Sequence, residues 1–291
     1  MSDSSDQPLC LLAVHAHPDD EASKGAGAAA KYAAEGVRTV LVCCTGGEAG
    51  DILNPAMDQP GIKDNLASVR LQELRESVRI LDYSTLYLLG YHDSGMPDTE
   101  TNKRPDNFAN APLDEAVGRL VRIIRQERPQ VLVTYADDRK FYPHPDHIRV
   151  HDISMPAFEQ AGDPNALPEL GEPWQPLKLY YTGFSLKRIK ALDQAYKERG
   201  MESPYTRWFE REKDLPPDWE DRHTTYVNVA DYMNKRAEAL LAHRTQIDPA
   251  GHWFRLPDEV IREIFPWEEF ILARSLVPTE TPEDDLFAGI R

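Results

Sequence analysis

The sequence has few cysteines, few basic residues for its acidic content, and no long apolar run. Cys10, Cys43 and Cys44 are the only cysteines among 291 residues. Their spacing fits neither a zinc knuckle nor a disulfide framework, so we expect small buried side chains in strands. The chain also lacks the run of about 18 or more apolar residues that a membrane-spanning helix needs. Because the first residues lack the basic start of a signal peptide, we expect a cytoplasmic protein.

The charge of the chain excludes further kinds of partner. Lys and Arg total 33 and Asp and Glu total 49, which gives a formal net charge of -16. Such a charge repels phosphate backbones and anionic lipids, so we expect neither a nucleic-acid nor a membrane partner. The length, with a hydrophobic content of 41%, allows one large domain or a main domain with a smaller elaboration.

The first part of the chain alternates strand and helix patterns. Apolar strands without polar alternation, separated by amphipathic helices, are typical of a parallel sheet covered on both faces. We therefore predict an α/β, Rossmann-like domain over residues 1–160, with a mostly parallel sheet flanked by helices. Its predicted strands are 11–15, 39–44, 85–89 and 131–135, and its predicted helices are 22–35, 65–81, 113–126 and 146–160.

The pattern is looser over residues 161–291. Four prolines fall in residues 164–176, and a charged segment spans residues 187–221. Strands are predicted near 177–181, 224–229 and 265–272, with a helix over 233–243. We interpret this part as a smaller α+β cap that completes a substrate cleft.

Polar motifs follow the predicted strands of the first part, where ligands of open α/β sheets bind. His17 and Asp20 follow the first strand, and His147 follows the fourth. Two imidazoles and one carboxylate with an open coordination position suit a zinc ion that catalyses hydrolysis. We predict that these three residues bind a divalent metal.

Asp19 and His144 are left over from this ligand set. A second carboxylate beside a metal can take a proton from water, and a second imidazole can protonate a leaving nitrogen. We therefore predict a general base at Asp19 and a general acid at His144. His15 lies inside the predicted first strand, so we interpret it as structural.

The same two clusters resemble a known family. Ala16-His17-Pro18-Asp19-Asp20-Glu21 with His144-Pro145-Asp146-His147 is similar to the zinc-dependent N-deacetylases of the LmbE and PIG-L kind. The match is closer to one branch, the mycothiol S-conjugate amidases, and it extends over essentially the full length. The further segments that carry it include Thr45-Gly46-Gly47-Glu48, Gly171-Glu172-Pro173-Trp174, Lys178-Leu179-Tyr180-Tyr181, Thr245-Gln246-Ile247-Asp248-Pro249 and Asp285-Leu286-Phe287-Ala288-Gly289.

The resemblance implies roles for further residues. Tyr142 would donate its hydroxyl to the oxyanion, and Asp146 would orient a neighbouring imidazole. One Zn²⁺ per chain is implied, with Fe²⁺ as the other ion that the site could hold. The residues implied for binding the sugar and inositol groups are Lys24, Glu48, Arg70 and Asp93.

The implied substrate is a small-molecule thiol conjugate. Cleavage of the amide between cysteine and glucosamine in a mycothiol S-conjugate would release an N-acetylcysteine S-conjugate and glucosaminyl-inositol, in detoxification or in one biosynthetic pathway. The chain departs from the family at Arg139-Lys140-Phe141, where the family tends to have two glycines. These bulky residues beside the second cluster could reshape the pocket.

Two other functions stay open. The first is the related deacetylase that removes acetate from N-acetylglucosaminyl-inositol. The second is a sugar or nucleotide binder without activity, although Thr45 to Gly50 lacks the glycine spacing of dinucleotide-binding loops. The sequence does not determine the oligomeric state or the preferred S-substituent.

Overall fold

The computed structural model describes residues 8–137, 139–140, 142–211, 215 and 218–291. Within these residues, seven strands form one sheet in the order β3-β2-β1-β4-β5-β7-β6. The first five strands in this order are parallel to one another, whereas β7 is antiparallel to both β5 and β6. The strands are β1 (Cys10–His15), β2 (Arg38–Thr45), β3 (Thr85–Tyr91), β4 (Val131–Thr134), β5 (Lys178–Thr182), β6 (Thr225–Asn228) and β7 (Trp267–Ser275).

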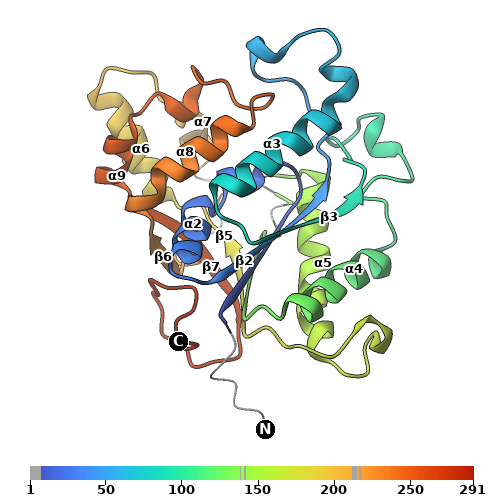
Figure 1. The fold of residues 1–291 in the computed structure, drawn as a ribbon. Helices are drawn as coiled ribbons and strands as arrows, with labels where there is room; N and C mark the ends of the chain where they lie inside the picture. Colours follow the sequence, from blue (N-terminus) through green and yellow to red (C-terminus); the bar gives the residue numbers. More distant parts are fainter. Residues whose placement is uncertain (1–7, 138, 141, 212–214, 216–217) are drawn as a thin grey trace.

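Helices cover both faces of this sheet (Figure 1). Helices α4 and α5 pack together on one face, and α2, α3 and α8 pack on the other. The helices are α1 (Asp20–Ser23), α2 (Ala26–Ala34), α3 (Leu66–Ile80), α4 (Leu113–Glu127), α5 (Pro145–Gly162), α6 (Leu186–Glu198), α7 (Thr206–Arg211), α8 (Met233–Ala242) and α9 (Asp258–Ile264). The prediction of a mostly parallel α/β fold is confirmed.

The central strands are apolar throughout because the sheet has a hydrophobic core on each face. In β1, Leu11 and Ala13 join the core beneath α2 and α8, whereas Leu12 and Val14 join the core beneath α4 and α5. Successive side chains of a strand point to opposite faces, so a strand buried on both faces shows no polar alternation. Burial also accounts for the cysteines, which are all free and buried.

The predicted helix over residues 22–35 is wrong, because the chain breaks it at Lys24 and Gly25. Lys24 is extended, and Gly25 has a φ of 81°. Helix α2 then begins at Ala26, where the amides of Gly27 and Ala28 donate to the buried carboxylate of Glu268 in β7 at 3.1 and 2.8 Å. A carboxylate at a helix N-terminus satisfies free amides and favours a start there.

The C-terminal part of the chain extends the same sheet. Residues 161–291 contribute β5, β6 and β7 and the helices α6 to α9. A smaller core joins α6 to the start of α9 through Leu192, Tyr196 and Leu256, with Val260 packed against it. The division at residue 160 stays a prediction. Among the described residues, no helix has the length and apolar character needed to cross a membrane.

Candidate metal centre and active site

The candidate metal-binding and catalytic residues lie beyond the carboxyl ends of the parallel strands. His17, Asp19 and Asp20 follow β1, Asp93 follows β3, and His147 lies in the first turn of α5, beyond β4. Parallel strands end at one edge of the sheet, which places these segments around a common crevice. The structure thus brings together side chains that lie up to 130 residues apart.

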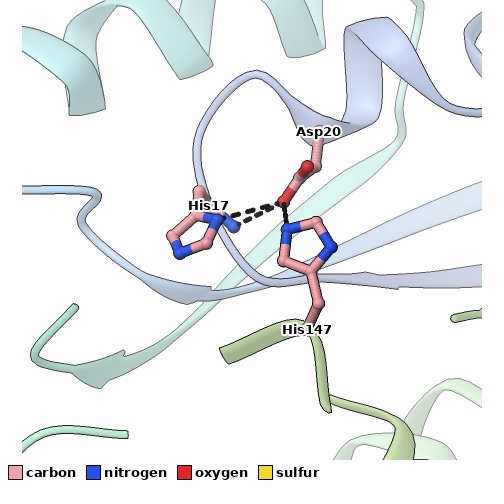
Figure 2. Close-up of side chains that lie close together, drawn as sticks. All are labelled: His17, Asp20 and His147. Atoms are coloured by element: carbon pink, nitrogen blue, oxygen red, sulfur yellow. Dashed lines mark hydrogen bonds and ion pairs between the residues drawn. The ribbon is translucent and has the colours of Figure 1, made fainter. Parts of the chain in front are cut away.

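The three predicted metal ligands form one cluster (Figure 2). Oδ2 of Asp20 lies 3.4 Å from Nδ1 of His17 and 3.5 Å from Nε2 of His147. All three residues are buried. Zinc with bonds of about 2.0 to 2.1 Å in a tetrahedral arrangement has its donor atoms roughly 3.3 to 3.4 Å apart, so the spacing of the donors fits such an ion.

The charge around His17 also suits a cation. Oxygens of Asp20, Asp93 and Asp146 lie within 3.7 Å of its ring nitrogens. Although burial disfavours a charged imidazole, hydrogen bonds to these carboxylates, with Asp146 first, hold the pKa of His17 well above its ordinary value. Buried carboxylates at this density require positive charge nearby, which a divalent ion supplies.

Asp146 determines which nitrogen of His17 can face a metal. Its Oδ2 lies 3.1 Å from Nε2 of His17 and also accepts from the amide of Ser94 at 2.9 Å. Because a carboxylate only accepts, Nε2 carries the hydrogen, and Nδ1, which faces Asp20, keeps the lone pair that binds a metal. A second group, His17 with Asp93 and His144, also has its possible ligand atoms within 4.8 Å of one another. We assign the ion to the first group because Asp146 occupies Nε2.

Asp19 adopts a strained backbone conformation beside the metal cluster. Its φ is 111°, a value that residues other than glycine rarely adopt and that costs on the order of 1 to 3 kcal/mol. Nη2 of Arg70 lies 2.8 Å from its Oδ2, and Nη1 donates to the carbonyl of Gly47 at 2.6 Å. Burial raises the pKa of the Asp19 carboxyl, while the Arg70 guanidinium opposes the rise. A raised pKa makes a carboxylate a stronger base.

His144 precedes α5 and has a defined tautomer. The amide of Asp146 donates to Nδ1 of His144 at 3.2 Å, so the ring hydrogen lies on Nε2. Burial lowers the pKa of this imidazole, and the charge of His17 lowers it further. Its ring centroid lies 4.6 Å from that of His17. Tyr142 is half exposed at the mouth of the site, with its ring 4.9 Å from that of His147.

A buried pair behind the site was not predicted as functional. Nε2 of His243, at the end of α8, lies 2.5 Å from Oε1 of Glu21, and both side chains are fully buried. Oε2 of Glu21 accepts from the amide of Asp19 at 3.0 Å, which helps to hold the strained conformation there. Glu21 belongs to the first polar motif, so the sequence does indicate that it lies near the site. His243 gives no signal, because only tertiary packing brings it to Glu21.

A cleft of about 340 Å³ opens over this cluster. Of the predicted substrate-binding residues, Lys24, Arg70 and Asp93 line it. Lys24 lies 2.5 Å from Oδ1 of Asp20, and with His147 it holds the pKa of Asp20 well below its ordinary value despite burial. Glu48 is not among the lining residues, and its Oε1 lies 2.9 Å from Nδ1 of His92.

Arg139, Lys140 and Phe141, which depart from the family pattern, directly precede the cleft residue Tyr142 in the sequence. Arg139 forms ion pairs with Asp137 at 2.6 Å and with Asp152 of α5 at 2.8 Å, and it is not a lining residue. Phe141 lies outside the described residues. An effect of this segment on the pocket stays a prediction.

Comparison with known proteins defines the class of this chain. The family model PIG-L, described as GlcNAc-PI de-N-acetylase, matches residues 12–158, which is more than half of the chain. The chain therefore belongs to the PIG-L family. Members of this family are hydrolases that act on amides, and the chain is a C–N hydrolase.

The similarity to individual relatives covers nearly the full length. The chain is 50% identical over 289 residues to the mycothiol S-conjugate amidase of Streptomyces coelicolor, covering 97% of this chain and 98% of that protein. It is 39% identical to a 1D-myo-inositol 2-acetamido-2-deoxy-alpha-D-glucopyranoside deacetylase of Streptomyces scabiei, covering 96% and 89%. The N,N'-diacetylchitobiose deacetylase of Pyrococcus horikoshii matches with a TM-score of 0.63 at 18% identity, covering 93% of this chain and 87% of that one, and supports the fold.

Proposed function

We propose that this chain is a zinc-dependent amidase that hydrolyses the cysteinyl-glucosamine amide of mycothiol S-conjugates. The products are an N-acetylcysteine S-conjugate and glucosaminyl-inositol. The observation that carries the proposal is the 50% identity to a mycothiol S-conjugate amidase over 97% of the chain. This identity includes the C-terminal part, which contributes to the cleft.

In this proposal His17, Asp20 and His147 hold the ion. The spacing of their donor atoms and the negative charge around them support zinc or a similar divalent ion. Zinc polarises a carbonyl and makes water a stronger nucleophile at neutral pH. Asp146 keeps Nδ1 of His17 directed at the ion site through its contact with Nε2.

The protein's own groups move the protons. Asp19 takes a proton from the attacking water while Arg70 fixes the position of its carboxylate. His144 acts as the general acid in its protonated form and delivers a proton to the leaving nitrogen, and the proton that Asp19 takes from the water balances this loss. The Tyr142 hydroxyl donates to the developing oxyanion, and one such donor contributes on the order of 3 kcal/mol to transition-state stabilisation.

Polar side chains of the cleft bind the sugar and inositol hydroxyls. Lys24 and Asp93 line the cleft, where Lys24 can donate and Asp93 can accept hydrogen bonds. Arg70 also lines it, but its two Nη atoms already bind Asp19 and the carbonyls of Pro18 and Gly47. Glu48 positions neighbours of the cleft: its carboxylate contacts the His92 ring and accepts a hydrogen bond from the amide of Asp93.

The second candidate is the deacetylase that removes acetate from N-acetylglucosaminyl-inositol. Its support is the 39% identity to a relative with that name over 96% of the chain. Both reactions cleave an amide on the same amino sugar, so the metal centre does not distinguish them. The two substrates differ in the acyl group on that sugar, which is a cysteinyl group in one and an acetyl group in the other.

The deciding experiment compares both substrates with one enzyme preparation. Zinc-loaded protein is incubated with a mycothiol S-conjugate and, separately, with N-acetylglucosaminyl-inositol, and amine and acetate are measured. We expect rapid amine release from the conjugate that Asp19→Ala abolishes. Asp106→Ala, which removes a carboxylate that is 59% exposed and does not line the cleft, is the matched control.

Each outcome has a defined meaning. Acetate release without cleavage of the conjugate would replace the amidase with the deacetylase. A protein that binds no stoichiometric metal and releases no product from either substrate would be a binder without activity. Metal analysis of protein purified without added metal tells whether zinc or iron fills the site.

A further inference from the structure

The cleft over the metal cluster also has an apolar wall, and the proposed reaction assigns no role to the residues of this wall. Besides its polar residues, the cleft is lined by Leu53, Leu240, Ile247 and Trp253. Leu240 and Ile247 are buried, whereas Leu53 is 62% exposed. A single exposed leucine needs no explanation, but an exposed leucine beside a tryptophan inside a cleft forms a surface for an apolar ligand.

Two distant segments build this wall and are firmly joined. The amide of Leu53 donates to the carbonyl of Thr245 at 2.8 Å. The side chain of Asn54 donates to the carbonyl of Arg244, and that of Gln246 donates to the carbonyl of Asp51, each at 2.9 Å. These bonds fix the loop after β2 against the loop after α8.

Deeper contacts hold both loops in place. The amide and hydroxyl of Thr245 donate to the buried carboxylate of Glu73 in α3 at 2.9 and 2.7 Å. The guanidinium of Arg236 lies 5.5 Å from the ring centroid of Trp253, and this cation–π contact helps to hold the ring. The wall is thus preformed, which lowers the entropy cost of binding.

The chemistry of the substrate tells which part of it meets the wall. The sugar and inositol groups carry hydroxyls, which suit polar residues of the cleft such as Lys24 and Asp93. The S-substituent is the part of a conjugate that can be apolar, so it matches the apolar residues. A Cβ placed on Gly50 would lie 2.9 Å from Nη1 of Arg70 and 3.7 Å from Oε1 of Gln246, so the loop that carries Leu53 lies close to both Arg70 and the segment of Ile247.

We propose, on the basis of the amidase function above, that Leu53, Ile247 and Trp253 form the subsite for the S-substituent of the conjugate. The chemical class it takes is an aromatic or long aliphatic group on the cysteine sulfur. An acetyl group has too little apolar surface to cover these three side chains. The subsite therefore makes the enzyme selective for conjugates of apolar electrophiles.

The test uses two conjugates of mycothiol that differ only in the S-substituent, S-benzyl and S-methyl. We expect the wild-type enzyme to cleave the S-benzyl conjugate with a kcat/KM about tenfold or more above that of the S-methyl conjugate. Trp253→Ala and Leu53→Ser should reduce this ratio about tenfold, mainly through KM for the S-benzyl conjugate. Leu276→Ser, at a leucine 57% exposed that is not a lining residue, should keep the ratio of the wild type.

The S-methyl conjugate also serves as the control for folding, because a misfolded variant loses both activities together. An unchanged benzyl to methyl ratio in both Trp253→Ala and Leu53→Ser, or no preference in the wild type, would overturn the subsite and leave the amidase function intact. Acetate release from N-acetylglucosaminyl-inositol, with neither conjugate cleaved, would overturn the amidase function and the subsite with it.

Discussion

Arg70 of α3 holds the carboxylate of Asp19 through a single ion pair, with Nη2 of Arg70 2.8 Å from Oδ2 of Asp19. The guanidinium is almost fully buried, whereas the carboxylate is about one quarter exposed and faces the cleft. The contact explains the glycines after β2. At Gly47, whose φ is 67°, a Cβ would lie 2.3 Å from Nη1 of Arg70, so a side chain there would displace the guanidinium.

Gly47→Ala should therefore lower activity through Arg70. We expect kcat/KM to fall on the order of 100-fold, because displacement of a catalytic group by about 1 Å can cost that much. Gly36→Ala is the matched control, since Gly36 has a φ of 83° and nothing within 4 Å of its added Cβ. It should lose about 1 to 2 kcal/mol of stability from backbone strain and keep its activity. Equal activity of the two variants in steady-state assays would contradict the role of Arg70.

Asp146→Asn should weaken metal binding. Asparagine offers Nε2 of His17 only a neutral acceptor, so the ring is held less firmly and is a weaker metal ligand, and loss of such a carboxylate partner typically reduces metal affinity about 10- to 100-fold. Competition with a zinc-chelating dye measures the dissociation constant. Asp152→Asn, in the same helix but paired with Arg139 at the surface, should bind zinc like the wild type. An unchanged dissociation constant in Asp146→Asn would exclude this role.

Lys178→Met should strongly destabilise the fold without affecting the metal. The Lys178 ammonium and the Glu283 carboxylate form a fully buried ion pair, and Glu283 also accepts from the hydroxyls of Tyr180 and Thr225. Removal of one partner of such a pair costs about 3 to 5 kcal/mol. Urea unfolding should show this loss in Lys178→Met and a smaller loss when Glu283→Gln is added. If the stability losses of the two single variants simply add in the double variant, the unpaired charge is not the cause of the destabilisation.

The three cysteines should resist alkylation in the native protein. Burial raises the pKa of Cys10 to about 12 and raises those of Cys43 and Cys44 well above the ordinary thiol value. At mildly alkaline pH the reactive thiolate is therefore scarce, and the sulfurs are shielded from solvent. Mass spectrometry after iodoacetamide treatment should find no modification without denaturant and three modified thiols with it. Rapid modification of the native protein would show that one of these strands opens.

The apolar strands and the amphipathic helices between them were predictable from the sequence. A strand buried on both faces must be apolar throughout, so its pattern survives in the sequence whatever the surrounding contacts are. The predicted helix over residues 22–35 shows where this reasoning fails. Its alanines favour a continuous helix, but the contact of the α2 amides with Glu268, some 240 residues away, decides where the helix restarts.

The cluster of His17, Asp20 and His147 was predictable from the sequence. His17 and Asp20 lie three residues apart at the end of β1, and His147 begins a helix after β4, so the order of the sheet and the local chain geometry are enough to bring them together. The contacts around that cluster were not predictable, because they depend on tertiary packing. The pair of Glu21 with His243 and the apolar wall of Leu53, Ile247 and Trp253 join segments about 200 residues apart, and no local pattern records such contacts because they arise only when packed elements meet.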